Sequence, residues 1–266
     1  MELWSTLHIQ TLLPAIIIFL AISILIGYLL RNKEEKIKMI PIQVIAIVLV
    51  VLEIMKQTYS IVNGYDLYHI PLHFCSLFVF FIPIFAFYKG KYMNQLRCFT
   101  TVCCTLVFFA MLIYPSIIYG EGSIRSFSTS FMSFHTVVFH NLVILALMLI
   151  VALNLHSFDT KRDMKTILIG YPVYSAIAGT MAQLLKTNYN SFYYFQVDSL
   201  DQIRLKAIEQ LGAGGQLLYV LVVAALLLIF AIGSYWVLRL YWHIFNTIKT
   251  NIRLKKERTL ELETKN

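Results

Sequence analysis

The sequence predicts an all-α fold, a polytopic membrane bundle of seven transmembrane helices. Three observations support this prediction: the overall composition, the spacing of the apolar runs, and the distribution of Lys and Arg between those runs. The 266-residue chain is 59% hydrophobic and only 14% charged, and its mean hydropathy is +0.72. A soluble globular domain has an apolar fraction nearer about 45–50% and a charged fraction nearer about 25%, so that class is excluded.

The apolar runs have the length of membrane spans, since each is close to the roughly 20 residues that cross about 30 Å of hydrocarbon as a helix. They cover residues 12–30, 39–57, 70–88, 98–115, 131–154, 166–185 and 216–240. Residues 1–248 are therefore predicted to form one transmembrane domain, and residues 249–266 a basic cytoplasmic tail.

The basic residues predict the orientation, because Lys and Arg near span ends are retained on the cytoplasmic side. Of the 22 Lys and Arg residues, 16 lie in residues 31–38, 89–97, 155–165 and 241–266, and only four lie in the alternate connections. The N-terminus is thus expected outside and the C-terminus inside. The net charge of +8 is explained by this topology and by attraction to anionic lipid, and no nucleic-acid partner is expected.

A polar motif stands where the third predicted span begins. Pro71 suits the first turn of a helix, and His69 and His73, four residues apart, would share one face of it. Cys75 follows His73 by two residues and would point about 200° away from it in a regular helix. Each of these side chains therefore needs partners from other segments.

Further polar residues are expected at the outer ends of the other spans. On the second span Glu53 can pair with Lys56 on one face of the helix, next to Gln57. Buried charges in a membrane cost at least about 2–3 kcal/mol each unless they are paired or hydrated, which makes them candidates for a functional site. His140 is expected near mid-membrane, and the outer group further includes His135, Gln183, Lys186 and Asn188. The inner halves of the spans carry almost nothing comparable.

Neither metal binding nor a disulfide framework is predicted. Beyond His69 and His73, the outer histidines show no spacing typical of a zinc site. Cys98, Cys103 and Cys104 lie in one predicted span, where small apolar packing roles are usual.

The longest connection, residues 186–215, is predicted to contain a short amphipathic helix from Ser199 to Leu211, ended by Gly212. It would serve either as a lid or as a solvated loop helix.

The motif Pro71-Leu72-His73-Phe74-Cys75, together with Glu53, the pair His135 and His140, and Asn188-Tyr189, resembles the YwaF-like bacterial integral membrane family. That family is similar to the eukaryotic transmembrane-164 family, whose members transfer acyl chains on ether phospholipids through a cysteine and a histidine. In the eukaryotic pattern the cysteine directly precedes the histidine, and this position is Leu72 here. The resemblance thus implies the fold and the pocket more directly than it implies the chemistry.

The leading hypothesis is acyl transfer between lipids in the outer leaflet of a bacterial plasma membrane, without a cofactor. His73 or His140 would act as base, Glu53 would orient a histidine, and Cys75 would be the nucleophile unless the histidines activate a lipid hydroxyl directly. The predicted substrate-binding residues are Lys56, His135, Gln183, Lys186, Asn188 and Tyr189. The alternative is a small-solute transporter or a ligand sensor that uses the same pocket.

Overall fold

The computed structural model describes residues 5–119 and 122–263, which form helices and no strand. The helices in chain order are α1 (Thr6–Leu30), α2 (Glu35–Lys38), α3 (Ile40–Val62), α4 (Phe78–Phe87), α5 (Met93–Ile113), α6 (Pro115–Tyr119), α7 (Phe131–Ala152), α8 (Thr160–Leu185), α9 (Asp198–Leu211) and α10 (Ala213–Glu263). Two 3₁₀ helices, η1 (Leu67–His69) and η2 (Cys75–Leu77), precede α4. The predicted all-α class is confirmed.

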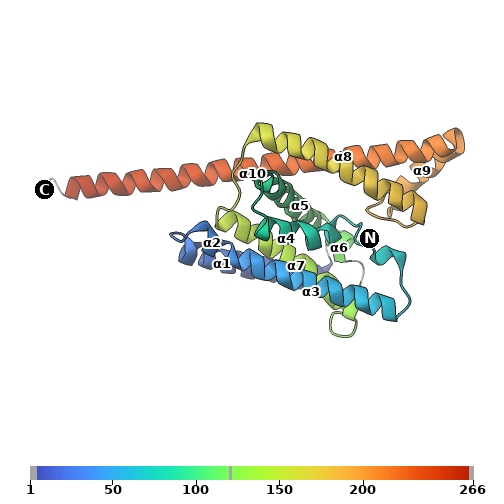
Figure 1. Cartoon of the computed structure of the whole chain (residues 1–266), viewed down its shortest axis with the longest axis horizontal. Coiled ribbons are helices and arrows are strands. Elements are labelled where there is room, and N and C mark those ends of the chain that lie inside the picture. Colours follow the sequence, from blue (N-terminus) through green and yellow to red (C-terminus); the bar gives the residue numbers. More distant parts are fainter. Residues whose placement is uncertain (1–4, 120–121, 264–266) are drawn as a thin grey trace.

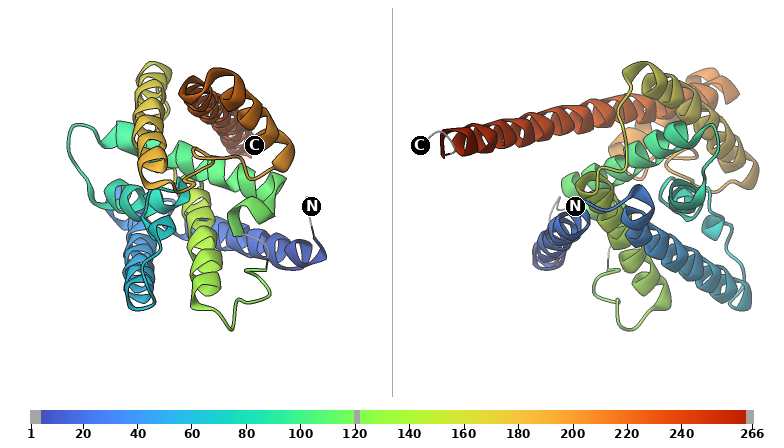
Figure 2. Two further views of the ribbon diagram at one scale, coloured as in Figure 1. Left: turned by 90° about the vertical axis from the view of Figure 1, so that its right-hand side faces the viewer. Right: turned by 60° about the vertical axis from the view of Figure 1, so that its left-hand side comes forward.

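Six helices of the described chain are long and apolar enough to cross a membrane: α1, α2 together with α3, α5, α7, α8, and α10 as far as Ile244. The chain is therefore a multi-pass membrane protein. The helix α10 continues without a break to Glu263, so the predicted tail is an extension of the last span. Figures 1 and 2 show this extension leaving the bundle as a single helix. Residues 264–266 of the predicted tail lie outside the described part of the chain.

The predicted span 70–88 is shorter in the structure than the sequence indicates. Only the ten residues of α4 are α-helical, which corresponds to a length of about 15 Å. The preceding chain from Leu67 to Leu77 consists of two 3₁₀ turns joined by irregular backbone. Non-helical backbone at membrane depth is tolerated where it is covered by protein or lines a cavity.

The helix α5 lies at the centre of the bundle. It contacts α4, α6, α7, α8 and α10. Of its apolar 18-residue stretch 61% is buried inside the protein, compared with 11% for the corresponding stretch of α1. In Figure 1 α8 and α10 lie along one side of α5, whereas α1, α3 and α7 lie along the other. The three cysteines of α5, Cys98, Cys103 and Cys104, are at most 1% exposed and belong to the core, as the packing interpretation predicted.

Long-range contacts define two ends of the bundle. At one end Tyr189 donates a hydrogen bond to the carbonyl oxygen of Leu67, and His135 faces Glu53. We call it the histidine end. At the other end, Arg97 forms an ion pair with Glu35 at 2.7 Å and reaches the loop after α7. We call this the tail end, because α10 extends beyond it. The predicted external segments 58–69 and 186–215 meet at the histidine end through the bond between Tyr189 and Leu67, and the basic segments 31–38, 89–97 and 155–165 meet at the tail end through Arg97.

Candidate functional site

The buried charge pair of the histidine end lies on α3. Lys56 Nζ is 2.9 Å from Glu53 Oε1, and Gln57 Nε2 donates to the same oxygen at 2.7 Å. Glu53 and Lys56 are only 6% and 7% exposed. The predicted pairing on one helix face is therefore confirmed. Lys56 does not extend toward solvent, because its ammonium group is held by Glu53.

The chain that follows α3 is hydrogen-bonded to polar residues of α3. Gln57 Nε2 also donates to the carbonyl oxygen of His69 at 2.8 Å, and Ser60 Oγ lies 2.7 Å from His69 Nδ1. Tyr65 donates its hydroxyl hydrogen to Gln57 Oε1 at 2.8 Å. The polar residues of α3 thus hold the irregular segment before α4 in place.

The expectation that a helix begins at Pro71 is wrong, since α4 begins at Phe78. The residue before a proline is disfavoured in the helical region, and Ile70 is extended, with φ −57° and ψ 133°. This conformation ends η1 and turns the chain before η2 begins at Cys75. Consequently the angle of about 200° between His73 and Cys75, which assumed a regular helix, does not apply.

His73 lies in this irregular segment between two tyrosine rings. Its ring centroid is 4.2 Å from that of Tyr68 and 5.3 Å from that of Tyr189. Its Nε2 atom is buried and has no hydrogen-bond partner. Cys75 is half-buried and its thiol is free of any disulfide. With the regular helix absent here, spacing alone does not separate the directions of His73 and Cys75.

His135 and His140 enter the site from α7. His135 Nε2 is 3.6 Å from Glu53 Oε2, which is longer than a hydrogen bond, and the Nε2 atom has no other partner. His140 Nδ1 lies 2.6 Å from the carbonyl oxygen of Thr136. A carbonyl oxygen only accepts, so in the neutral ring Nδ1 carries the proton and the unpartnered Nε2 has the free lone pair.

The loop after α8 contributes Asn188 and Tyr189. Asn188 Oδ1 accepts hydrogen bonds from the backbone N–H groups of Tyr193 and Tyr194, both at 3.2 Å, whereas Nδ2 is buried and unpartnered. Tyr189 is fully buried against His73. These two predicted residues therefore adjoin the histidines.

Two other predicted binding residues are placed differently. Gln183 uses both of its amide atoms to hold the loop and α10, donating to the Phe192 carbonyl at 2.7 Å and accepting from Gln216 at 3.1 Å. Lys186 is exposed and follows the last turn of α8 in a left-handed conformation, with φ 51°. Substrate binding by either residue remains a prediction.

The histidine end thus contains four buried polar atoms without hydrogen-bond partners: His73 Nε2, His135 Nε2, His140 Nε2 and Asn188 Nδ2. Burying such a group without a partner costs about 1–3 kcal/mol, so a bound molecule that pairs with it would be strongly favoured. The Lys56 ammonium lies in the same group, because Glu53 holds it at 2.9 Å and faces His135 at 3.6 Å. Three imidazoles, a carboxylate and an ammonium group are sufficient for proton transfer and for stabilising an oxyanion.

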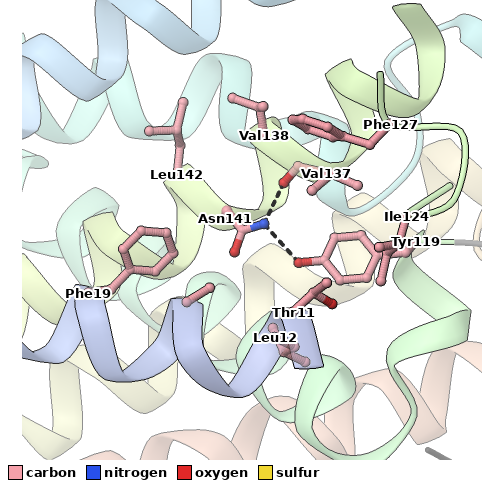
Figure 3. A pocket seen from close by; sticks show the side chains of 11 residues that line it. Thr11, Leu12, Phe19, Tyr119, Ile124, Phe127, Val137, Val138, Asn141 and Leu142 are labelled. Atoms are coloured by element: carbon pink, nitrogen blue, oxygen red, sulfur yellow. Dashed lines mark hydrogen bonds between the residues drawn. The ribbon is translucent and has the colours of Figure 1, made fainter. Parts of the chain in front are cut away.

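A largely apolar pocket of about 500 Å³ lies beside this group, between α1 and α7 (Figure 3). Asn141 projects into its centre, donating to the Tyr119 hydroxyl at 3.0 Å and to the Val137 carbonyl at 2.8 Å, while its Oδ1 is unpartnered. The ring of Tyr119 is edge-on to His140, with centroids 6.2 Å apart. Tyr119 therefore separates the pocket from the histidine. The sequence does not reveal this pocket, because its apolar lining does not differ from ordinary core residues.

A second buried polar group lies at the tail end, where the predicted spans meet the connections 89–97 and 155–165. At the tail end Cys98, His156 and Asp163 are buried together, and Arg97 is 8% exposed beside them. Sequence reasoning missed the group because its members belong to three elements. One signal was present: all three lie close to the same predicted membrane face.

The comparisons with known proteins identify the family. No match was found among curated proteins, and none among solved structures. The model of the TMEM164 family matches residues 3–236, which includes α1 to α9 and most of the membrane-spanning part of α10. This range contains every residue of the histidine end described above, and the expected relation to the transmembrane-164 family is confirmed. The chain belongs to the TMEM164 family.

Proposed function

We propose that this protein transfers an acyl chain between lipids in the outer leaflet of a bacterial plasma membrane. The observation that carries the proposal is the group of buried, unpartnered polar atoms at the histidine end, three of them imidazole Nε2 atoms. Membership of the TMEM164 family supports a lipid substrate, because the resemblance of the motifs implies acyl transfer on phospholipids. In this proposal the chain crosses the membrane seven times, with α4 and the irregular segment before it as the third crossing.

His140 is the general base of the proposed reaction. Its Nδ1–H is held by the Thr136 carbonyl, which fixes the tautomer and directs a free lone pair from Nε2. The acceptor hydroxyl gives its proton to Nε2 as its oxygen attacks the ester carbonyl of the donor lipid. The new ester bond forms, the donor's C–O bond breaks, and the leaving oxygen takes the proton back from His140.

The remaining residues of the histidine end bind and polarise the substrate. The carbonyl oxygen becomes negative during transfer, and the Lys56 ammonium and the Asn188 amide are the donors available to it. Glu53 holds Lys56 at 2.9 Å, and among the histidines its carboxylate lies near His135 at 3.6 Å. The alternative route uses Cys75 as the nucleophile. A histidine first takes the proton of the Cys75 thiol, the acyl chain moves from the donor lipid to the sulfur as a thioester, and a second transfer moves it to the acceptor hydroxyl.

The apolar pocket between α1 and α7 suits the hydrocarbon chain of such a substrate. Pockets that bind small apolar molecules have volumes of about 300–1,000 Å³, which includes the roughly 500 Å³ found here. Because Tyr119 lies between Asn141 of the pocket and His140, a chain in the pocket would have its ester group beside Tyr119, and the Tyr119 ring would turn aside to let the ester reach the histidines.

The packing below the histidines favours an enzyme over a transporter. One turn toward the tail end from Glu53 and His140 lie Leu49 and Ile144, which are both 0% exposed, and Phe78 of α4 is also 0% exposed. A continuous polar path through the bundle would have to displace these side chains. The histidine end is therefore a blind site that opens to the outer leaflet in our proposal.

The test uses purified full-length protein in vesicles of phosphatidylethanolamine and phosphatidylglycerol whose acyl chains are isotopically labelled, with an unlabelled lysophospholipid added. We expect the label to appear on the lysophospholipid, as measured by mass spectrometry. Lipid analysis of cells with and without the protein would then identify the natural donor. Solute uptake or ligand binding without any acyl transfer would overturn the proposal and support a transporter or a sensor.

The proposed topology has a separate test. Accessible tags placed within 31–38, 89–97 and 155–165 should be cytoplasmic, and tags within 58–69 and 186–215 should be external, because of the bias of the basic residues. An external Lys161 would place the histidine end in the inner leaflet and contradict the outer-leaflet assignment.

A further inference from the structure

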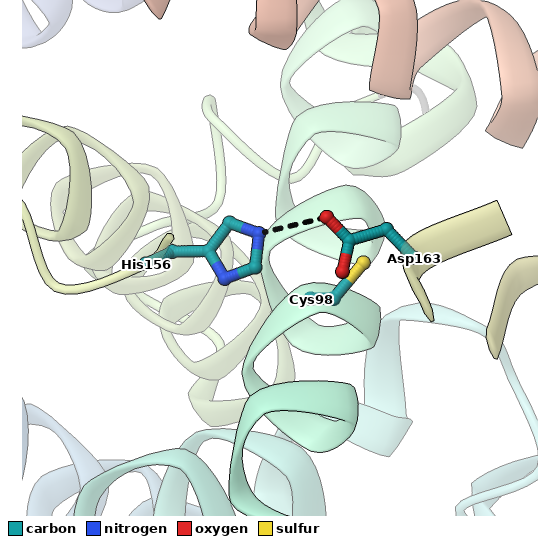
Figure 4. A group of neighbouring side chains, drawn as sticks. All are labelled: Cys98, His156 and Asp163. Carbon is teal, nitrogen blue, oxygen red and sulfur yellow. Dashed lines mark ion pairs between the residues drawn. The ribbon is translucent and has the colours of Figure 1, made fainter. Parts of the chain in front are cut away.

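A second buried group of reactive side chains lies at the tail end, far along the bundle from the histidines. Cys98 comes from the first turns of α5, His156 from the loop between α7 and α8, and Asp163 from the first turn of α8 (Figure 4). Each offers one ligand atom, and these atoms all lie within 4.8 Å of one another. The residues are 0%, 5% and 0% exposed, so bulk water does not solvate them.

The distance between the His156 nitrogen and the Asp163 oxygen is closer to that of two ligands of one metal ion than to that of a direct hydrogen bond. His156 Nε2 is 3.7 Å from Asp163 Oδ2, beyond the range of a hydrogen bond, and Nε2 has no other partner. Two ligands at about 2.0–2.2 Å from a tetrahedral zinc ion are about 3.3–3.6 Å apart. A metal ion would therefore fit between the two atoms with a shift of a few tenths of an ångström.

The surroundings of Asp163 hold its carboxylate in position for such a role. Arg162 Nε donates to Oδ1 at 2.9 Å, and the backbone N–H of Asp159 donates to Oδ2 at 2.9 Å. A carboxylate oxygen has two lone pairs, so Oδ2 retains one for a ligand on the side of His156. Partners of this kind, which orient a ligand from behind, are typical of metal sites.

The donor set indicates the metal. Thiolate and imidazole ligands with one carboxylate favour Zn²⁺, whereas Mg²⁺ and Ca²⁺ require oxygen ligands. The competing interpretation is a His156–Asp163 ion pair without a metal. That pair would bury an imidazole N–H with no acceptor within hydrogen-bond distance, which costs about 1–3 kcal/mol.

We propose that Cys98 Sγ, His156 Nε2 and Asp163 Oδ2 bind one Zn²⁺ ion at the tail end, with water as the fourth ligand. On binding, the Cys98 S–H bond breaks, the Zn–S bond forms, and the proton passes to water. The ion joins α5 to α8 and to the loop before α8. Its role is to stabilise the bundle, since the histidines of the proposed reaction lie at the other end.

The experiment measures the metal content of the tag-free full-length protein, purified in detergent from cells grown with added zinc. We expect close to one zinc per chain in the wild type and a small fraction of that in Cys98→Ser and His156→Ala. Cys104→Ser is the matched control, because Cys104 is equally buried on the same helix but lies outside the group. It should retain the wild-type zinc content.

Cobalt substitution then distinguishes direct ligation from adventitious binding. Co²⁺ bound through a thiolate gives a sulfur-to-metal charge-transfer band, which should be present in the wild type and in Cys104→Ser and absent in Cys98→Ser. The proposal would be overturned if the purified wild-type protein contained no zinc. It would also be overturned if the charge-transfer band persisted in Cys98→Ser. Both readouts are independent of acyl transfer, so they stand whether or not the proposed function is correct.

Discussion

At the tail end the Asp163 carboxylate receives N–H groups from Arg162 and Asp159, and the one unpartnered nitrogen of His156 points into a compact group of ligand atoms. At the histidine end Glu53 is similarly held by Lys56 and Gln57. The Nε2 atoms of the three histidines at that end also have no hydrogen-bond partner, but among the described residues they do not form a compact group of ligand atoms. The same residue types are thus arranged compactly at one end, as a metal requires, and dispersed at the other, as a larger molecule requires.

The largest expected effect tests the division of labour between the two ends. His140→Ala removes the proposed base and should lower the rate of acyl transfer by about 10²–10⁴-fold, the usual contribution of general base catalysis. His156→Ala, at the tail end, should leave the transfer rate per folded molecule close to that of the wild type. The measurement is transfer of labelled acyl chains in vesicles, normalised to protein that elutes as a single species in gel filtration.

The reverse result would break the comparison. If His156→Ala abolished transfer in folded protein while His140→Ala retained it, the reactive site would lie at the tail end and the histidine end would be structural. His8→Ala provides a further control, because His8 is a buried histidine of α1 that is hydrogen-bonded to Ser5 and lies outside the proposed site.

The second prediction concerns the buried charge pair of α3. Glu53→Ala leaves Lys56 as an unpaired charge within the bundle and should reduce the free energy of unfolding by about 3–5 kcal/mol. The double variant Glu53→Ala with Lys56→Met removes both charges, and it should recover most of this loss because no buried charge remains. Thermal unfolding in detergent measures both effects.

An equal loss of stability in the single and the double variant would show that Lys56 does not depend on Glu53. Acyl transfer should be lost in both variants, because Glu53→Ala leaves the Lys56 ammonium without the carboxylate that positions it and the double variant removes the ammonium itself. Recovery of stability without recovery of activity would therefore separate the structural role of the pair from its functional role.

The third prediction separates the two chemical routes at the histidine end. Cys75→Ser should retain a measurable part of the acyl transfer, at most about tenfold below the wild type, if the histidines activate a lipid hydroxyl directly. The residue before His73 is Leu72, so the thiol does not occupy the position that the resemblance assigns to it. A loss equal to that of His73→Ala would establish the thiol as nucleophile, and trapping of an acyl thioester on Cys75 would confirm it.

Much of the fold could be predicted because hydropathy reports on helices that cross a membrane. Six predicted spans correspond to long helices, and the amphipathic helix predicted for residues 199–211 is α9, ended by Gly212 at φ +57°. The start of α4 could not be predicted. Ile70, Leu72 and Phe74 are apolar whether their backbone is helical or irregular, so an apolar run alone does not reveal the break before Phe78.

The candidate site shows the same limit at the level of side chains. The contact of Glu53 with Lys56 was predictable, because residues three apart on one helix are neighbours. The group at the tail end was not, because His156 and Asp163 are brought to Cys98 only by the packing of α5 against α7 and α8. Contacts within one helix follow from spacing, whereas contacts between helices need the three-dimensional arrangement.

The smallest expected effect comes from a charge pair near the surface, which completes the comparison with the buried pair of α3. On α9 Asp201 accepts a hydrogen bond from Arg204 Nε at 2.6 Å and another from the backbone N–H of Phe195 at 2.9 Å. Arg204 also donates to Gln216 on α10 at 3.2 Å, so the pair links α9 to the last span. Solvent screens such pairs, and Asp201→Asn should reduce the free energy of unfolding by only about 0.2–1 kcal/mol.

The pH dependence of this difference has a definite sign. The hydrogen bonds from Arg204 hold the pKa of Asp201 below its ordinary value, so the carboxylate stabilises the fold at every pH above the unfolded value of about 3.9. The contribution is lost as the pH falls through the lower folded value. The gap in unfolding temperature between the wild type and Asp201→Asn should thus stay constant from about pH 6 to pH 8 and close below about pH 4. A gap that changed between pH 6 and pH 8 would mean that a group other than Asp201, with a pKa in that range, controls how α9 packs on the bundle.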